Sequence, residues 1–299
     1  MIYNCIYELY QIWKGIAMEV NSIFLAMAGL LPAIILCVYI FRTDRVEKEP
    51  LPLLMKLFFA GALCCFPAAE LENIIIGVID GVFSQIPITK TVYYVYTAFY
   101  YFIGVALVEE GLKWIVLYAV TKNNSEFNCL FDGLIYAIFV SLGFAALENI
   151  FYVLEYGWIN AFMRAVLSVP GHMFFAVMMG YYYSLWHITE KAKETEELFK
   201  SKGLIPYSVP GFDCKRYTYL TIAVPILFHG IYNYCCSMGT MAANLVFLGF
   251  VIFMYIYCFR KIRLMSEGDA YQTKYVTAML IGKYPQLKEE TQEKEEVLP

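Results

Sequence analysis

Charged residues are scarce in this chain. Only 16% of its 299 residues are Asp, Glu, Lys or Arg, whereas a typical soluble domain holds about 25%, and 60% of its residues are hydrophobic. This composition argues against a soluble globular protein and indicates a polytopic membrane protein. The net charge of −4 comes largely from the terminal stretch EETQEKEEVLP, and nothing in the sequence indicates nucleic-acid binding.

Paired-cysteine motifs, processing signals and repeats are also missing. The nine cysteines include no C-x-x-C pair, so we interpret them as small buried residues rather than as a disulfide framework or a metal cluster. The N-terminal stretch has no basic start and no A-x-A site, and it does not resemble a cleaved signal peptide. We find no internal repeat and expect no second folded domain.

Long apolar runs, in contrast, are abundant. A spanning helix needs about 20 mostly apolar residues, and the sequence predicts an all-α, polytopic membrane helical bundle of about seven transmembrane helices. The expected spans are 22–41, 54–79, 92–120, 130–154, 158–187, 217–237 and 240–259. A short cytoplasmic helix is expected within 264–284, and the charged stretch after it is expected to be disordered.

Basic residues alternate between the expected loops. They gather after the first span, after the fifth span and after the last span, while the loops between carry almost none. By the positive-inside rule, the N-terminus lies outside and the C-terminus lies in the cytoplasm of a multi-pass protein of the cell membrane. We therefore expect an extracytoplasmic segment over 1–21, a transmembrane domain over 22–260 with its core over 92–237, and a cytoplasmic tail over 261–299.

Three ionisable residues fall inside the third expected span. Each costs about 2.5–3.5 kcal/mol at the bilayer centre on insertion scales, so they are expected to have a use. Lys113 follows Glu109 by four residues and should pair with it, whereas Glu110 points about 100° away and is the expected proton acceptor. A purely structural Glu–Lys pair is the plain alternative, but it leaves Glu110 unexplained.

The fourth span carries a stripe of small and polar residues. Ala137, Ser141, Ala145 and Asn149 recur every four residues, a pattern that lets helices approach closely in lipid. Glu148 lies beside this stripe, toward the outer end of the span. We expect it to have a functional role, which includes scaffolding a site.

Two of the three histidines lie in the middle of expected spans. His172 follows Pro170 and Gly171, which are expected to break the helix, and such a break is tolerated at membrane depth only inside protein or beside a cavity. His229 and Asn233 are four residues apart and face the same way. A lone buried histidine is usually structural, but two together with two mid-span glutamates are hard to explain as an accident.

These side chains together could hydrolyse an acyl or peptide bond. A carboxylate flanked by imidazoles can take a proton from water, and imidazole and amide groups can hold the oxyanion that forms. Glutamate with two histidines is also a possible zinc set. Because no H-E-x-x-H motif is present, we expect no tightly held zinc or other cofactor, while leaving zinc open. The groups should line one water-accessible cavity near the membrane midplane.

The polar residues fall in five short motifs: V-E-E-G-L-K at 108–113, F-D-G at 131–133, G-F-A-A-L-E-N-I-F-Y at 143–152, P-G-H at 170–172 and H-G-I-Y-N at 229–233. These motifs resemble those of the PrsW-type intramembrane proteases, within the CAAX-protease and bacteriocin-processing superfamily. Each motif is weak alone, but their order and spacing together are fairly specific. The match covers roughly 100–235 and leaves Glu70, Glu72 and the tail unexplained.

The resemblance implies a multi-pass membrane protease and a set of roles. A glutamate of the E-E pair, Glu109 or Glu110, would activate water, His172 corresponds to the family's P-x-H histidine, and His229 with Asn233 would support the oxyanion. Lys113, Glu148 and Asn149 would support these groups. The family activity implied is first-site cleavage of a membrane-anchored anti-sigma factor.

The leading hypothesis is an intramembrane endopeptidase that acts on a single-pass membrane protein and cuts it near its outer membrane boundary. A proton- or cation-coupled transporter is the main alternative, because buried Glu and His also relay protons. Transporters usually contain repeats with paired broken helices, and none is present. A non-catalytic scaffold is a third possibility, against which the intact glutamates and histidines argue.

Overall fold

The computed structural model describes residues 2–207 and 209–288, with side chains described from residue 19 onward. Over these residues the chain is helical apart from turns, loops and one isolated antiparallel bridge between Cys129 and Tyr271, which confirms the predicted all-α class. The helices are α1 (Ile2–Thr43), α2 (Leu51–Leu63), α3 (Cys65–Phe83), α4 (Lys90–Phe99), the π-helix η1 (Tyr100–Ala106), α5 (Leu107–Thr121), α6 (Asp132–Val166), α7 (Ser168–Ser201), α8 (Lys215–Ser237), α9 (Met241–Glu267) and α10 (Gln272–Lys283). The stretch 289–299, expected to be disordered, lies outside the described residues.

Five stretches of the described chain are long and apolar enough to cross a membrane. They are Glu19–Thr43, Leu51–Phe83, Asp132–Ser201, Lys215–Ser237 and Met241–Glu267. The expected spans 130–154 and 158–187 both fall in the third stretch, and 92–120 is divided among α4, η1 and α5. The polytopic bundle is therefore confirmed, although its stretches do not match the seven expected spans one for one.

The helix ends add two details. The helix α1 begins at Ile2 and continues into the first expected span, and the extracytoplasmic position of the segment 1–21 stays a prediction. Pro170 does not break a helix in mid-course. It lies in the first turn of α7, where a missing backbone N–H costs little, and the true interruption is at Leu167. The short helix expected within 264–284 is α10.

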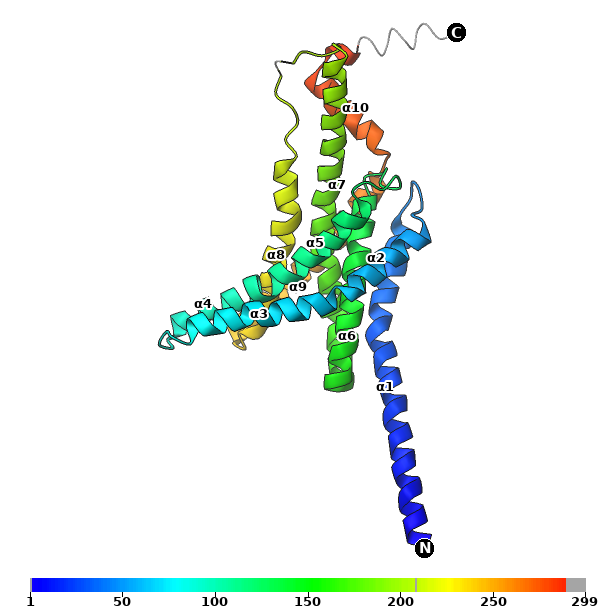
Figure 1. The fold of residues 1–299 in the computed structure, drawn as a ribbon, viewed down its shortest axis with the longest axis vertical. Helices are drawn as coiled ribbons and strands as arrows, with labels where there is room; N and C mark the ends of the chain where they lie inside the picture. The colour runs from blue at the N-terminus through cyan, green and yellow to red at the C-terminus, as the bar shows by residue number, and fades with distance from the viewer. Residues whose placement is uncertain (1, 208, 289–299) are drawn as a thin grey trace.

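The helix α6 lies at the centre of the bundle, with α1, α2 and α7 packed around it (Figure 1). Its first half is buried on all sides. It is antiparallel to α7, since the hydroxyl of Ser141 donates to the carbonyl of His172 while Gly133 faces Ser184 at the other end. Ala137 and Ser141 of the predicted small stripe thus pack on α7, whereas Asn149 donates to the carbonyl of Gly29 on α1.

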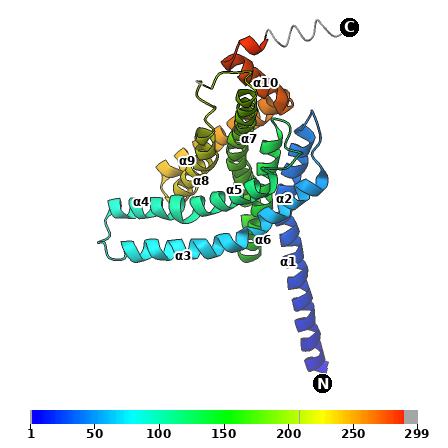
Figure 2. The same cartoon turned by 45° about the horizontal axis from the view of Figure 1, so that its top comes forward.

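Two glycines let the backbones of α2 and α6 come into contact where the helices cross. A Cβ on Gly61 would lie 2.0 Å from the carbonyl oxygen of Val140, and one on Gly143 would lie 1.9 Å from that of Phe58. Close crossings of this kind are made by small residues in membrane helices. The helices α2–α3 and α4–η1–α5 then run side by side across the α6–α7 pair, and α3 and α4 extend beyond it (Figures 1 and 2). This crossing brings the start of α5 onto the bundle core.

Candidate functional site

The acidic pair and its lysine lie at the start of α5, directly after the π-helix η1. Glu109, Glu110 and Lys113 are all buried, with exposed fractions of 5%, 0% and 1%. π-Helical segments are rare and often occur at functional sites. Three charges so placed need partners inside the protein, and the structure supplies them from three other helices.

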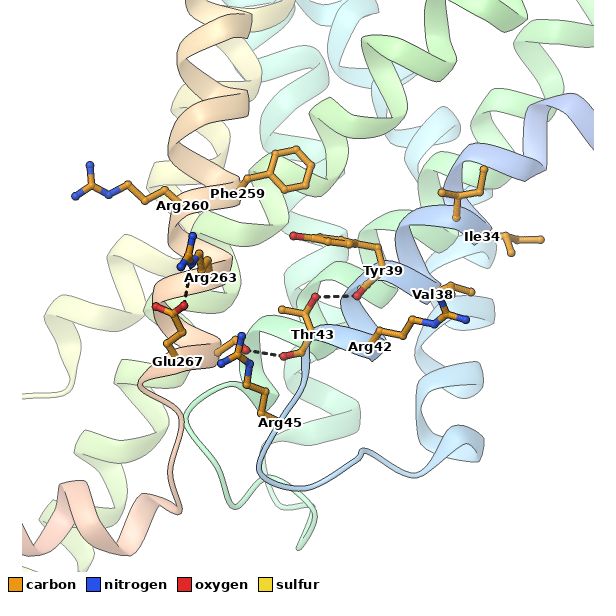
Figure 3. Close-up of a pocket in the computed structure, with 12 residues that line it drawn as sticks. Ile34, Val38, Tyr39, Arg42, Thr43, Arg45, Phe259, Arg260, Arg263 and Glu267 are labelled. Carbon is orange, nitrogen blue, oxygen red and sulfur yellow. Dashed lines mark hydrogen bonds and ion pairs between the residues drawn. The ribbon is translucent and has the colours of Figure 1, made fainter.

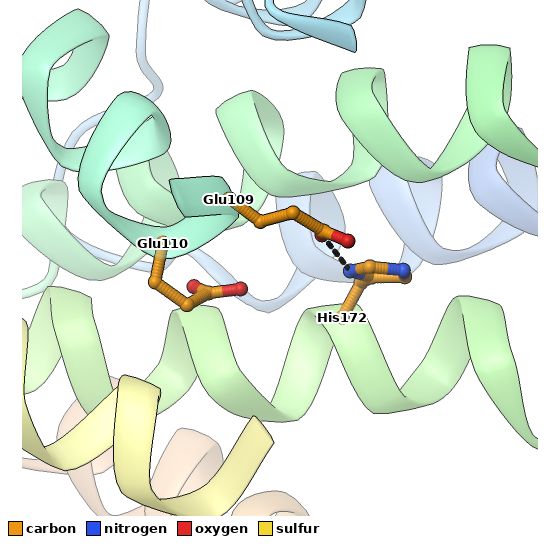
Figure 4. Close-up of side chains that lie close together, drawn as sticks. All are labelled: Glu109, Glu110 and His172. Carbon is orange, nitrogen blue, oxygen red and sulfur yellow. Dashed lines mark ion pairs between the residues drawn. The ribbon is translucent and has the colours of Figure 1, made fainter. Parts of the chain in front are cut away.

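The ammonium group of Lys113 is the centre of the cluster. It donates to Oε2 of Glu109 and to Oε1 of Glu110, both at 2.9 Å, and lies 3.1 Å from Nδ1 of His172 on α7. It also lies 4.1 Å from the centre of the Phe144 ring. The expected pair of Lys113 with Glu109 is therefore present, but Lys113 holds Glu110 as well. Figure 4 shows how the two glutamates and His172 converge.

These contacts decide which nitrogen of His172 carries the proton. An ammonium can only donate, so Nδ1 of His172 accepts from Lys113 and is unprotonated. The proton is then on Nε2, which donates to Oε2 of Glu148 at 3.0 Å. His172 thus connects the α5 cluster to α6, with its ring held at both nitrogens.

A kink in α6 brings Arg164 back to Glu148, the residue that holds His172. Gly157 has φ 76° and ψ −162°, a conformation essentially confined to glycine. In a straight helix, residues 148 and 164 would lie about 24 Å apart, yet Nη2 of Arg164 is 2.7 Å from Oε2 of Glu148. Nε of Arg164 donates to Asn149, which donates in turn to the carbonyl of Gly29 on α1.

His229 reaches the cluster from α8. Its Nδ1 is 3.0 Å from Oε1 of Glu110, and its ring stacks on Phe175 with centroids 4.6 Å apart. Gly230 allows this approach, because a Cβ there would lie 2.3 Å from the ring of Phe102 in η1. Asn233, one turn further along α8, is half-buried and makes no side-chain hydrogen bond to any described residue.

The structure therefore gathers most of the expected site residues in one place. Glu109, Glu110, His172 and His229 meet around Lys113, and Glu148 and Asn149 join through His172 and Arg164. Asn233 stands apart from this network. The cluster is nearly closed in this state: side-chain exposure is 6% at Glu109 and rises to 22% only at Glu148.

The sequence analysis gave no role to two charged residues that lie at or beside the site, Arg164 and Glu72. Arg164 lay unnoticed inside the expected span 158–187, although a lone arginine in an apolar run after a glycine was a usable signal. Glu72 on α3 is half-buried and interacts electrostatically with Glu109, Glu148 and Lys113. Glu72 therefore lies within electrostatic range of the cluster, at its edge.

The F-D-G motif has a structural role instead. A carboxylate oxygen of Asp132 accepts the backbone N–H groups of Asn128 and Cys129, which fixes the turn before α6. Gly133 lets Ser184 of α7 approach, since a Cβ there would lie 2.5 Å from its hydroxyl oxygen. This motif orients α6 from a distance and does not touch the cluster.

The side chains at the centre also offer ligand atoms for a metal ion. Glu109, Glu110 and His172 each provide one ligand atom, and these atoms lie within 4.8 Å of one another. The ammonium of Lys113, however, already contacts all three residues, at 2.9 Å from Oε2 of Glu109, 2.9 Å from Oε1 of Glu110 and 3.1 Å from Nδ1 of His172. Oε2 of Glu110 is buried with no hydrogen-bond partner among the described residues. A second cation there would meet strong repulsion, so the residues as arranged fit an ammonium and not a divalent metal.

The kink gives a direct test of how the cluster is held. We expect Gly157→Ala to lower the unfolding free energy by about 1–3 kcal/mol, because alanine resists this backbone conformation, and to release Arg164 from Glu148. Arg164→Gln should be destabilising alone but add little in the Gly157→Ala background. Thermal unfolding in detergent measures both.

A matched control is available for this prediction. Gly81 in α3 has a helical backbone and open space around it. Gly81→Ala should therefore be neutral or mildly stabilising. Full additivity of the Gly157 and Arg164 substitutions would contradict the coupling.

Comparisons with known proteins identify the family of the chain. The chain matches the model of the PrsW family intramembrane metalloprotease over residues 49–259. The protease PrsW of Oceanobacillus iheyensis is 32% identical over 81% of this chain and 95% of its own length. The protease PrsW of Bacillus subtilis is 30% identical over 78% of this chain and 92% of its own length. No solved structure gives a significant match. By this match, which covers most of the chain, the protein belongs to the PrsW family of membrane proteases.

Proposed function

We propose that this membrane protease cleaves a single-pass membrane protein by general-base catalysis from a glutamate. Family membership favours the protease over the transporter among the alternatives drawn from the sequence. The observation that carries the mechanism is the buried arrangement around Lys113, in which two carboxylates lie beside two imidazoles. These are groups that can take a proton from water and return it to a leaving amine.

In the proposed mechanism Glu109 is the general base. It holds only Lys113 and is 5% exposed, whereas Glu110 is fully buried and holds both Lys113 and His229 through Oε1. Each glutamate keeps one oxygen free of these contacts, so the slight exposure of Glu109 decides the assignment. Water gives its proton to Glu109 and its oxygen bonds to the scissile carbonyl carbon. The C–N bond then breaks, and the proton passes to the leaving nitrogen. This assignment replaces Glu110, which the helix spacing alone favoured.

The other groups hold charge and position in this scheme. Glu110 accepts from Nδ1–H of His229. In this scheme His229 is an imidazolium, so that its Nε2–H can also donate to the oxyanion. Asn233, which makes no side-chain hydrogen bond to any described residue, is the proposed second donor. Glu148, with Arg164, holds His172, and His172 accepts from Lys113, so these residues position the carboxylates without contacting the substrate.

A chemical-rescue experiment separates the two glutamates. Glu109→Ala should lower the cleavage rate by about 10²–10⁴-fold, the usual contribution of a general base, and added formate should restore part of it. Glu110→Ala should lose activity without rescue, because its carboxylate holds two other side chains. The readout is cleavage of a tagged membrane substrate in proteoliposomes. Rescue of Glu110→Ala alone would move the base to Glu110.

The family description names a metalloprotease, while the position of Lys113 argues for hydrolysis without a metal. We expect the wild-type protein to hold well under one zinc per chain. Lys113→Ala removes the competing cation and should bind about one zinc or cobalt ion, as three protein ligands suffice for a zinc site. Elemental analysis after desalting, and the visible spectrum of cobalt, measure this independently of activity.

Two control variants accompany the metal measurement. Lys113→Ala combined with His172→Ala should lose the ion again, and Lys122→Ala, at the other end of α5, should gain none. A stoichiometric zinc in the wild-type protein that disappears in His172→Ala would establish a metalloprotease and overturn the proposal.

The substrate class and membrane orientation complete the proposal. Basic residues near the ends of the helices favour an outside N-terminus. In that orientation Glu148, where the cluster is most exposed, lies in the outer half of the α6 segment that precedes the kink at Gly157. A membrane-anchored anti-sigma factor is the substrate that the family resemblance implies. We expect cleavage near its outer membrane boundary, which leaves a fragment with its cytoplasmic part and most of its spanning helix.

Mass mapping of products tests the cleavage position. Purified enzyme and a single-pass substrate tagged at both ends are reconstituted together, with the Glu109→Ala variant as the inactive control. A cut on the cytoplasmic side would show that the orientation proposed here is wrong, even if the protein is active.

A further inference from the structure

A large groove lies away from the charged cluster, between α1 and α9 (Figure 3). It has a volume of about 1040 Å³, which is the upper end of the range for small-molecule sites. The rings of Tyr39 and Phe259 meet edge to face across it with centroids 5.6 Å apart. The hydroxyl of Ser266 donates to the carbonyl of Thr43, which ties the two helices together at one end.

Four arginines surround that tied end of the groove. Arg263 makes an ion pair with Glu267 at 2.8 Å, and Arg45 also lies within electrostatic reach of Glu267. Arg42 and Arg260 are exposed at opposite edges and have no ion pair or side-chain hydrogen bond with any described residue. One acid for four guanidinium groups leaves a net positive charge, which calls for an anionic partner.

The rest of the groove is apolar and runs along the membrane-spanning part of α1. Ile34, Ile35 and Val38 line it, with 44–57% of each residue exposed. Ile35 also lines a second, apolar pocket of about 460 Å³, which continues past Leu31 to the segment of α6 after its kink. An apolar path therefore leads from the arginines along α1.

The length of this path matches one leaflet. Arg42 and Leu31 are eleven residues apart, which is about 16 Å at 1.5 Å per residue, and half of a hydrocarbon core is about 15 Å. A free phosphate would use the arginines and leave the apolar path empty. Basic pockets between transmembrane helices commonly bind the head groups of anionic lipids.

We propose that this groove binds one anionic phospholipid, with its phosphate among Arg42, Arg45 and Arg260 and an acyl chain along Ile35 and Val38. The site is separate from the charged cluster and does not depend on the mechanism proposed above. It gives the protein a fixed lipid between its first and last spanning helices, where few direct contacts join them.

The test is lipid retention by the full-length protein. The wild-type chain and an Arg42→Gln/Arg260→Gln variant are exchanged into mixed phosphatidylglycerol and phosphatidylcholine, re-purified, and the bound lipid is counted by native mass spectrometry. We expect about one phosphatidylglycerol on the wild type. The variant should retain it roughly 30-fold less well, because each basic residue near an anionic lipid contributes about fivefold to binding.

Two further variants make the result specific. Lys202→Gln/Lys274→Gln changes the net charge equally at exposed positions away from the groove and should retain lipid normally. Val38→Trp keeps every charge but fills the apolar path, and it should lose the lipid. Equal retention by all variants would overturn the proposal.

Competitors identify what the arginines recognise. Inorganic phosphate alone should not displace the lipid, because it cannot use the apolar path. Displacement by phosphate at millimolar concentration, or by an acidic peptide that leaves no lipid bound, would assign the groove to those ligands and overturn the lipid proposal.

Discussion

The charged cluster depends on one ammonium group. Lys113 is 1% exposed and would be very costly to bury alone, yet two carboxylates, an imidazole nitrogen and an aromatic ring surround it. The two carboxylates in turn need Lys113, because the like charges of Glu109 and Glu110 would otherwise repel each other. The helices α5 and α7 meet at this group, and Glu110 carries the connection on to His229 of α8. The geometry of the proposed mechanism therefore follows from how one cation is neutralised.

Much of this arrangement could be predicted because its elements obey helical spacing. The separation of Glu109 and Lys113 by four residues fixes their contact before any tertiary structure is known. The two mid-span histidines were recognisable because polar residues are rare at that depth. Family motifs then indicated that these groups belong together, although spacing alone could not say which helices would meet.

The parts that could not be predicted depend on backbone geometry and on tertiary packing. Arg164 reaches Glu148 only because Gly157 adopts a backbone conformation that other residues avoid. The spacing of apolar residues in the sequence does not predict such a kink. Glu72 joins the cluster only because α3 lies across the bundle beside α5. The contact of Lys113 with Glu110, in contrast, was missed although the spacing allows it, because residues three apart and residues four apart on a helix are both neighbours.

The kink in α6 also affects the order in which the cluster can assemble. Arg164 and Glu148 are 16 residues apart and Glu148 and His172 are 24, so the chain loops that these contacts close are short and entropically cheap. Lys113 meets His172 over 59 residues, and Glu110 meets His229 over 119. During synthesis from the N-terminus, Glu110 of α5 is therefore made more than a hundred residues before its partner His229 of α8. Lys113 pairs with both glutamates within a single helix. This pairing reduces three separate charges to a net charge of −1 and lowers the cost of burying that helix before α8 is made.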